Sequence, residues 1–300
     1  MDADYLIDRQ RLKNRILLWR TLAIVTLLMF IAALIIKFGS FSSEAYIARI
    51  KIENLIHNDP KRLAIIEKVL RDQDAKALIV RINSPGGTIV GGEALYKALY
   101  RFRREKPVVA IMDELATSAG YLVAVGANHI IAHEGTITGS IGVIFQTAEI
   151  TELLKKLGVK FEAIKSTPLK SEPSPFTKLT PKTRKATKRL VDDIYNMFIQ
   201  IIAKSRNLKL EKVRILADGR LYTGRMAVKN GLVDEIGDEL QAKIWLEKEI
   251  KINKSTPIRD ITIHRGLENW LDYASSFLQK SQISDRLILD GLVSVWHAYN

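Results

Sequence analysis

The sequence predicts an α/β protein built on a mostly parallel β-sheet. Short apolar runs that are typical of buried strands occupy residues 46–52, 77–82 and 107–112, and helix-forming stretches separate them. Strands that alternate with helices are typical of parallel sheets joined by crossover helices. The chain has 300 residues, of which 47% are hydrophobic and 26% charged. This composition excludes intrinsic disorder, collagen and low-complexity fibres.

The expected elements follow one another in an order that supports this fold. Residues 46–52 alternate in polarity like a strand, and Asp59 and Pro60 are suited to the N-cap and first position of the helix after it. The elements expected next are a strand at 77–82, a glycine-rich turn at 83–87, a helix at 90–103, a strand at 107–112, a short apolar helix within 113–126, strands at 129–132 and 140–145, and a long basic helix from Thr180-Pro181 to about residue 205.

An apolar run near the N-terminus predicts a membrane anchor. Residues 21–36 carry no charge, and as a helix they would extend about 24 Å, whereas a bilayer core needs about 30 Å. The run becomes long enough if residues 16–20 and 37–38 join it, with Arg20 extending outward. A buried core helix and a cleaved signal peptide are the alternatives. We expect an uncleaved transmembrane anchor at 16–38, because the run is apolar on all sides and lacks an evident small-residue cleavage site.

The flanking charges predict the orientation of this anchor. The basic residues before the run are Arg9, Arg11, Lys13, Arg15 and Arg20, while only Lys37 follows closely. Basic flanks stay in the cytoplasm. We therefore expect a single-pass protein of the inner membrane, with a tail at 1–15 in the cytoplasm. The domain at 39–250 is expected outside the cytoplasm, followed by a helical extension at 251–300. In that extension, Leu267, Trp270, Leu271, Ala274 and Leu278 share one helical face.

The net charge of +13 is concentrated in two places. Residues 1–38 hold six basic and three acidic side chains, and residues 151–190 hold eleven basic and three acidic ones. An anionic partner is expected, either nucleic acid or a membrane surface. The basic residues are not interleaved with aromatic ones, so we expect a membrane and no nucleic acid. The chain has no cysteine. This excludes disulfides, thiolate zinc sites and cysteine nucleophiles, and with no HExxH spacing we expect neither metal nor cofactor.

Two strand ends carry residues suited to chemistry at the edge of a parallel sheet. Asn83-Ser84-Pro85-Gly86-Gly87 follows one strand, and adjacent glycines let a backbone approach a ligand with its N–H groups. Ser118 follows the next strand among small residues, which is how a serine nucleophile is exposed. An ordinary tight turn and a helix N-cap are the alternatives for these two segments.

A nucleophilic serine needs a base, and the sequence offers two kinds. His133, close to the end of the strand at 129–132, is one alternative. A lysine within the proline-containing segment 164–176 is the other. Such a lysine must be neutral, so its reference pKa of about 10.4 must fall by roughly three units through burial or neighbouring positive charge.

Five motifs in register resemble the bacterial signal peptide peptidase A family of membrane-anchored serine proteases. They are NSPGG at 83–87, ATSAGY at 116–121, TITGSIGV at 136–143, LKSEPSPF at 169–176 and DGRLYTGRMAVKNGLVDEIG at 218–237. The resemblance covers about residues 45–250. It implies a Clp-protease/crotonase-like spiral of ββα units, a homo-oligomer with active sites that neighbouring subunits can share, and cleaved signal peptides or other apolar peptides as substrates.

The resemblance also implies a role for individual residues. Ser118 resembles the nucleophile and Lys170 the general base, with Lys165 as the alternative lysine. The N–H of Gly87, with that of Ser118 or Ala119, resembles the oxyanion hole. Ser140 resembles the hydroxyl that orients the lysine. Many relatives have glycine where this chain has Ala119, and the extra methyl is expected to narrow the site.

Three other classes of protein are weighed against this assignment. A Clp-type histidine triad would need a histidine near TGSIGV, where this chain has Ser140. An acyl-CoA enzyme of the crotonase type would use carboxylates, with Glu114 as the nearest candidate. A non-catalytic membrane scaffold would have no need to keep both Ser118 and Lys170.

Overall fold

The computed structural model describes residues 3–38, 44–262 and 292–295, and the chain divides into two units between Glu44 and Ala45. In the first unit, the structure describes the helix α1 (Ala3–Phe38). Large apolar side chains from Ile16 to Ile31 on this helix are exposed. In the part of the chain that the structure describes, no helix has both the length and the apolar character needed to cross a membrane. The anchor expected at 16–38 therefore stays a prediction.

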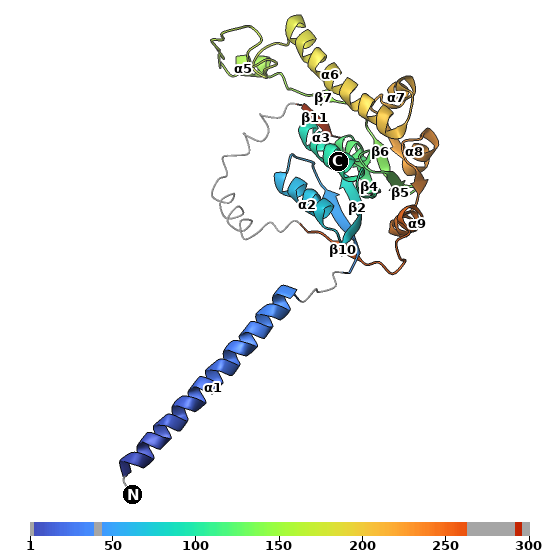
Figure 1. The fold of residues 1–300 in the computed structure, drawn as a ribbon. Coiled ribbons are helices and arrows are strands. Elements are labelled where there is room, and N and C mark those ends of the chain that lie inside the picture. The colour runs from blue at the N-terminus through green and yellow to red at the C-terminus, as the bar shows by residue number, and fades with distance from the viewer. Residues whose placement is uncertain (1–2, 39–43, 263–291, 296–300) are drawn as a thin grey trace. The chain divides into compact units, whose positions relative to one another are not determined.

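The second unit is a mixed α/β fold, as the sequence predicted (Figure 1). Its strands are β1 (Tyr46–Glu53), β2 (Ala75–Ser84), β3 (Gly86–Thr88), β4 (Val108–Thr117), β5 (His129–Ala132), β6 (Ile137–Gly139), β7 (Ile144–Phe145), β8 (Leu221–Thr223), β9 (Glu235–Ile236), β10 (Ile258–Asp260) and β11 (Leu292–Val295). Its helices are α2 (Pro60–Arg71), α3 (Ile89–Phe102), α4 (Ala119–Ala124), α5 (Thr151–Lys156), α6 (Pro181–Arg206), α7 (Leu210–Leu216), α8 (Gly224–Asn230) and α9 (Glu239–Ile250).

The main sheet is largely parallel. Its strand order is β10-β1-β2-β4-β5-β9, and all of these pairs are parallel. Strand β6 pairs parallel with β4 and antiparallel with β8. A second small sheet has the order β3-β11-β7 and is antiparallel. The sheet is therefore mixed, with parallel pairing in its centre.

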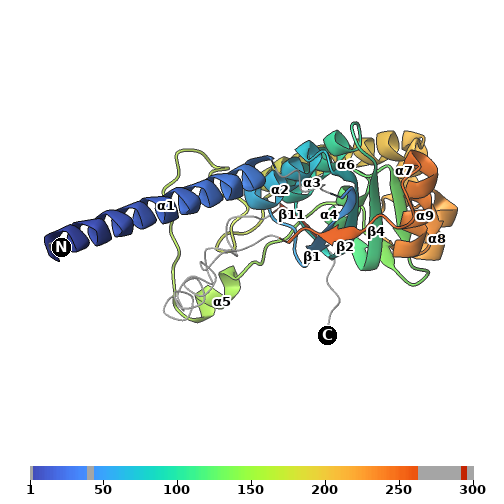
Figure 2. The ribbon, with the colours of Figure 1, turned by 60° about the horizontal axis from the view of Figure 1, so that its bottom comes forward.

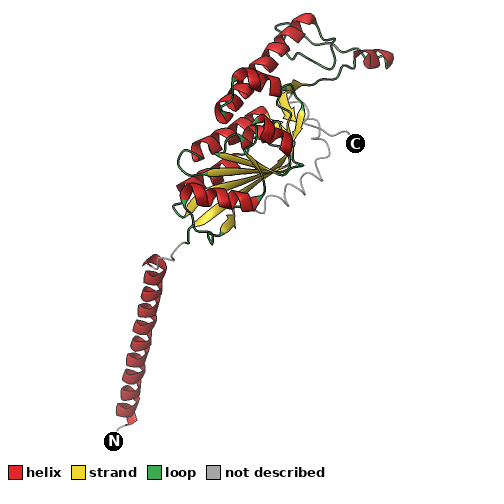
Figure 3. Ribbon diagram, turned by 90° about the vertical axis from the view of Figure 1, so that its right-hand side faces the viewer, coloured by secondary structure: helices red, strands yellow, loops and turns green. Residues whose placement is uncertain are grey.

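Both faces of the main sheet are buried, because successive residues of a strand point to opposite sides. Ala48 and Ile50 of β1 belong to the larger core, which helices α2, α3, α4 and α6 share. Ile47 faces a smaller core that includes Ala242 and Leu246 of α9. Figures 2 and 3 show the strands with helices on either side.

Two helix starts form as the sequence predicted. Asp59 accepts hydrogen bonds from the backbone N–H groups of Lys61 and Arg62, with Pro60 in the first turn of α2. Thr180 accepts from Thr183 at the start of α6, again followed by proline. These caps satisfy N–H groups that have no partner within the helix.

Other boundaries differ from the expected ones. The strand expected at 140–145 is replaced by β6 and β7, and Ser140 between them has φ +48°, a left-handed conformation that a strand does not contain. The helix expected within 113–126 begins only at Ala119, because β4 continues to Thr117. Within 251–300, the strands β10 and β11 occur, while the helical face expected at 267–278 lies outside the described residues.

Candidate active site

Ser118 occupies a strained turn between β4 and α4. Its backbone has φ +55° and ψ −118°, and the residue is 1% exposed. A non-glycine residue in this region costs about 1–3 kcal/mol, and such strain clusters at functional sites. Its side chain makes no capping hydrogen bond to α4. The hydroxyl is therefore not used as a helix cap, which was the alternative role for this serine.

The strand β6 holds Ser118 from one side and brings Ser140 close in the fold. Thr117 lies opposite Gly139 in the parallel pairing of β4 and β6, and the Ser118 N–H donates to the Gly139 carbonyl at 2.8 Å. The next residue, Ser140, donates its own N–H to the Arg220 carbonyl at 2.8 Å. The two serines predicted to act together thus follow paired residues of adjacent strands.

Gly87 lies in β3, a strand that contacts helix α4 directly after the Ser118 turn. A Cβ atom on Gly87 would be only 1.9 Å from the Ile56 carbonyl oxygen, so a glycine is required at this position. Ser84 lies opposite Ala116 in the β2–β4 pairing, and α4 packs against β3. The NSPGG and ATSAGY segments are therefore neighbours, although 28 residues lie between them in the chain.

The backbone hydrogen bonds distinguish the two alternative oxyanion donors, the N–H groups of Ser118 and Ala119. The Ser118 N–H already donates to Gly139. Ala119 is the first residue of α4, so its N–H has no acceptor within the helix. Its methyl group points toward α3, where a Cβ on Gly92 would be 3.0 Å from it. Ala119 also lines a narrow apolar niche with Ile89, Leu122, Ile194, Met197 and Phe198.

A segment from the end of the chain pairs with the edge of β3. Strand β11 is antiparallel to β3, with Ser294 opposite Gly87 and Val293 opposite Thr88. On its other side β11 pairs with β7, with Leu292 opposite Phe145. Strands β3 and β7 thus accept an extended chain between them by backbone pairing.

Lys170 lies away from Ser118 within this chain. It is exposed, in a segment between β7 and α6 that extends from the sheet with α5 at its far end (Figures 1 and 3). Among the described residues, no interaction joins Lys170 to Ser118. We call residues 146–180 the arm, and none of them is buried. The structure brings Ser118, Ser140, Gly87 and Ala119 together but does not bring Lys170 to them.

Lys165 is engaged in an ion pair that was not predicted from the sequence. Its Nζ lies 2.6 Å from Glu172 Oε1, and the side chains are 19% and 9% exposed. The hydrogen bond from Lys165 lowers the pKa of Glu172, burial opposes it, and a hydrogen bond from Thr177 adds to the lowering. No local pattern in the sequence pairs these two charges, because they come together only where the arm turns back.

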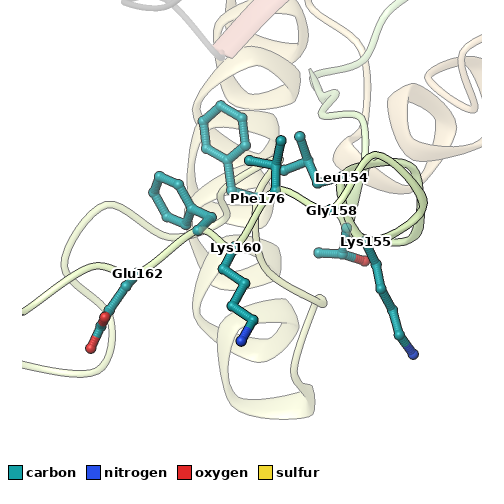
Figure 4. A pocket seen from close by; sticks show the side chains of 9 residues that line it. Leu154, Lys155, Gly158, Lys160, Glu162 and Phe176 are labelled. Atoms are coloured by element: carbon teal, nitrogen blue, oxygen red, sulfur yellow. The ribbon is translucent and has the colours of Figure 1, made fainter.

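The arm also contains an open hollow of about 530 Å³. Phe161 and Phe176 stack beside it with ring centroids 4.6 Å apart. In Figure 4, Phe176 and Leu154 lie at the hollow, while the charged ends of Lys155 and Glu162 point away from Phe176. The side of the arm that carries these aromatic rings is exposed.

The carboxylate and histidine alternatives lie elsewhere. His129 donates to or accepts from Glu235 at 2.9 Å and stacks on Trp245. His133 and Glu114 line a separate hollow with Arg81 and Asp113. In the described ranges, no cluster of three His, Asp or Glu residues is arranged to hold a metal ion.

Comparison with known proteins identifies the family of this chain. Residues 101–253 match the model of peptidase family S49. "Putative protease slr0021" of Synechocystis is 40% identical over 205 residues, which cover 68% of this chain and 74% of that protein. "Putative signal peptide peptidase SppA" of Enterococcus faecium is 35% identical, covering 77% of this chain and 69% of that protein.

A more distant relative extends the same pattern. "Protease 4" of Haemophilus influenzae is 31% identical over 219 residues, covering 73% of this chain and 35% of its own length. The strained serine, the glycine strand beside it and the sequence match point to one class of enzyme. The chain belongs to peptidase family S49, the signal peptide peptidase A family, and is a serine peptidase.

Proposed function

We propose that this chain is an endopeptidase in which Ser118 is the nucleophile and Lys170 the general base. The observation that carries the proposal is the antiparallel pairing of β11 with β3 opposite Gly87, beside the strained Ser118 turn. A substrate peptide would take the same extended path. Backbone pairing accepts many sequences, which suits an enzyme for varied peptides.

The proposed reaction is acyl transfer. Neutral Lys170 removes the Ser118 proton while Oγ attacks the peptide carbonyl carbon. The N–H groups of Gly87 and Ala119 stabilise the negative oxygen of the tetrahedral intermediate. Lys170 then returns the proton to the leaving amine, the C–N bond breaks, and water releases the acyl group by the reverse sequence. Ser140 would orient the lysine amine.

We further propose that a second copy of the chain supplies Lys170, in an oligomer of the Clp-protease/crotonase type. Lys170 lies on an arm that has no buried residue, and this arm exposes large apolar side chains. These are Leu153, Leu157, Val159, Phe161, Ile164, Leu169, Phe176 and Leu179. Exposed apolar patches of this kind favour contact with another protein surface.

The proposed substrates are cleaved signal peptides and other short apolar or unfolded peptides at the inner membrane, on its extracytoplasmic side. The exposed apolar residues of α1 favour attachment to lipid. The reaction as written uses no cofactor, and nucleic acid has no part in it. Carbonate extraction of isolated membranes tests whether the chain is anchored in the bilayer. Digestion by protease added to spheroplasts tests whether the domain lies on the extracytoplasmic side. A chain released by carbonate, or protected in spheroplasts, would contradict this location.

The deciding experiment measures cleavage of a panel of apolar peptides by the detergent-solubilised full chain. We expect Ser118→Ala and Lys170→Ala each to lose activity. Mixing these two inactive variants should restore part of it if the dyad forms between subunits. An acyl-CoA enzyme of the same fold would keep its activity in Ser118→Ala, and a non-catalytic scaffold would leave Ser118 unlabelled by a fluorophosphonate probe.

A further inference from the structure

The loop that carries Lys170 is closed at its base by one carboxylate, that of Glu172, whose side chain is largely covered. Glu172 is 9% exposed, although it belongs to an arm in which most residues are exposed. A carboxylate is rarely buried to this degree unless it is paired. Glu172 therefore has a role beyond that of a surface charge.

The partners of Glu172 come from both sides of the loop. Lys165 Nζ donates to Oε1 at 2.6 Å from the residues before the loop. Thr177 Oγ1 donates at 3.0 Å to Oε1 and 3.1 Å to Oε2, and the Ser174 N–H donates to Oε2 at 3.2 Å, from the residues after it. Both carboxylate oxygens accept hydrogen bonds, so the Glu172 carboxylate joins the two sides of the loop.

Between these two sides the chain turns back on itself. The Lys170 N–H donates to the Thr167 carbonyl at 3.1 Å, and the Glu172 N–H to the Leu169 carbonyl at 3.2 Å. Ser171 has a left-handed φ of +58°. Lys170 thus lies in the turn at the tip, two residues from the group that joins the sides.

We propose that Glu172, through Lys165, is a positioning residue that holds the Lys170 loop in the shape needed to reach the nucleophile. This inference rests on the proposed function of Lys170. It assigns Lys165 to an ion pair and not to proton transfer. Misplacing a reacting group by about 1 Å costs about 10²-fold in rate, which sets the expected size of the effect.

The test separates positioning from proton transfer by comparing arginine and neutral replacements. Arginine remains protonated at working pH and can keep an ion pair, but it cannot act as a base. We expect Lys165→Arg to retain kcat within about threefold of wild type and Lys170→Arg to be inactive. A Lys165→Arg variant without activity would overturn the proposal, because an ion pair that arginine can keep would not explain the loss.

Removal of the ion pair is the second arm of the test. Glu172→Ala and Lys165→Met should each lower kcat by about 10²-fold with KM changed by less than about threefold. The matched control is Glu162→Gln, an exposed carboxylate on the same arm, which should match wild type. If Glu172→Ala and Lys165→Met retain the wild-type kcat while Lys170→Ala is inactive, this inference fails and the proposed function stands.

A charge exchange keeps the test decisive if the single variants fold poorly. Lys165→Glu combined with Glu172→Lys restores one ion pair across the loop, and it should regain at least about tenfold in kcat over Glu172→Lys alone. Equal kcat values for the single and double variants, with equal thermal stability, would contradict a positioning role for the ion pair of Lys165 and Glu172. Absence of peptide cleavage by the wild type would instead reject the proposed function.

Discussion

The backbone N–H of Ser118 donates to the carbonyl oxygen of Gly139 at 2.8 Å, so a strand of the sheet fixes the amide of the proposed nucleophile. An amide used in this way cannot also stabilise an oxyanion. Of the two donors that the sequence left open beside Gly87, Ala119 is therefore the one we favour. The same bond ties the angle of the Ser118 turn to the conformation of Gly139.

The first prediction concerns Gly139→Ala. Gly139 has φ +87°, and a Cβ there would be 2.6 Å from the Tyr222 ring. The substitution should cost about 1–3 kcal/mol in stability and lower kcat through movement of Ser118. Thermal melting and peptide hydrolysis measure both effects. Gly135→Ala is the control, because a Cβ at Gly135 meets nothing within 4 Å. Equal losses of stability and kcat in the two variants would contradict a specific role of Gly139 in holding the Ser118 turn.

The second prediction concerns β11, which occupies the edge of β3 that a substrate would use. Ser294→Pro removes one N–H donor and should weaken this pairing. A hydrogen bond is worth about 0.5–1.5 kcal/mol, which corresponds to roughly a two- to twelvefold increase in apparent peptide affinity. KM for a short apolar peptide measures the change. Ser294→Ala retains the N–H and should leave KM unchanged. An unchanged KM in both variants would contradict the prediction that β11 competes with substrate for the edge of β3.

The third prediction concerns the ion pair between Arg206 and Asp234. The guanidinium donates to both carboxylate oxygens, at 2.6 and 2.9 Å, and to the Gly231 carbonyl. The Arg206 side chain is 10% exposed. Arg206→Met leaves the carboxylate without its main partner, so we expect a loss of about 3–5 kcal/mol in the free energy of unfolding, measured by denaturant titration at neutral pH. A loss below about 1 kcal/mol would show that water replaces the arginine.

The same pair predicts a pH dependence, which is the fourth prediction. Burial raises the pKa of Asp234, but the hydrogen bonds and charge of Arg206 more than offset this, so the pKa lies below its ordinary value. A carboxyl with a lower pKa in the folded state adds stability above its unfolded pKa of about 3.9, and this contribution is lost as the pH falls through the folded pKa. Wild type should therefore lose more stability than Arg206→Met between pH 6 and pH 3. Parallel plots of unfolding free energy against pH for the two proteins would show that Arg206 does not lower the pKa of Asp234.

Local signals made part of this molecule predictable. The Asp59-Pro60 and Thr180-Pro181 pairs predicted helix starts because a cap acts within one turn. The turn at Ser118 and the glycines at 86–87 predicted two of the site's segments, because backbone conformations that favour small residues are visible in composition. The parallel order followed from the alternation of strands and helices.

The remaining features depend on contacts between distant parts of the chain. The pairing of β11 with β3 joins residues about two hundred positions apart, and no local pattern specifies it. The division of the strand expected at 140–145 depends on the left-handed Ser140, whose N–H is held by Arg220. The ion pair of Lys165 and Glu172 depends on how the arm folds back. Lys170 was assigned from a motif, and its separation from Ser118 in one chain was not visible there.

The last prediction concerns assembly through the arm. Ile164 is 100% exposed, and burying such a side chain against a second copy would gain about 1.5–3 kcal/mol. Ile164→Asp should shift the detergent-solubilised protein toward smaller species in analytical ultracentrifugation and lower peptide hydrolysis in parallel. Ile215→Asp on α7 is the control, since that side chain is 73% exposed but lies outside the arm. If both variants sediment like wild type, or if Ile164→Asp dissociates and remains fully active, the shared active site is wrong and Lys170 must reach Ser118 within one chain.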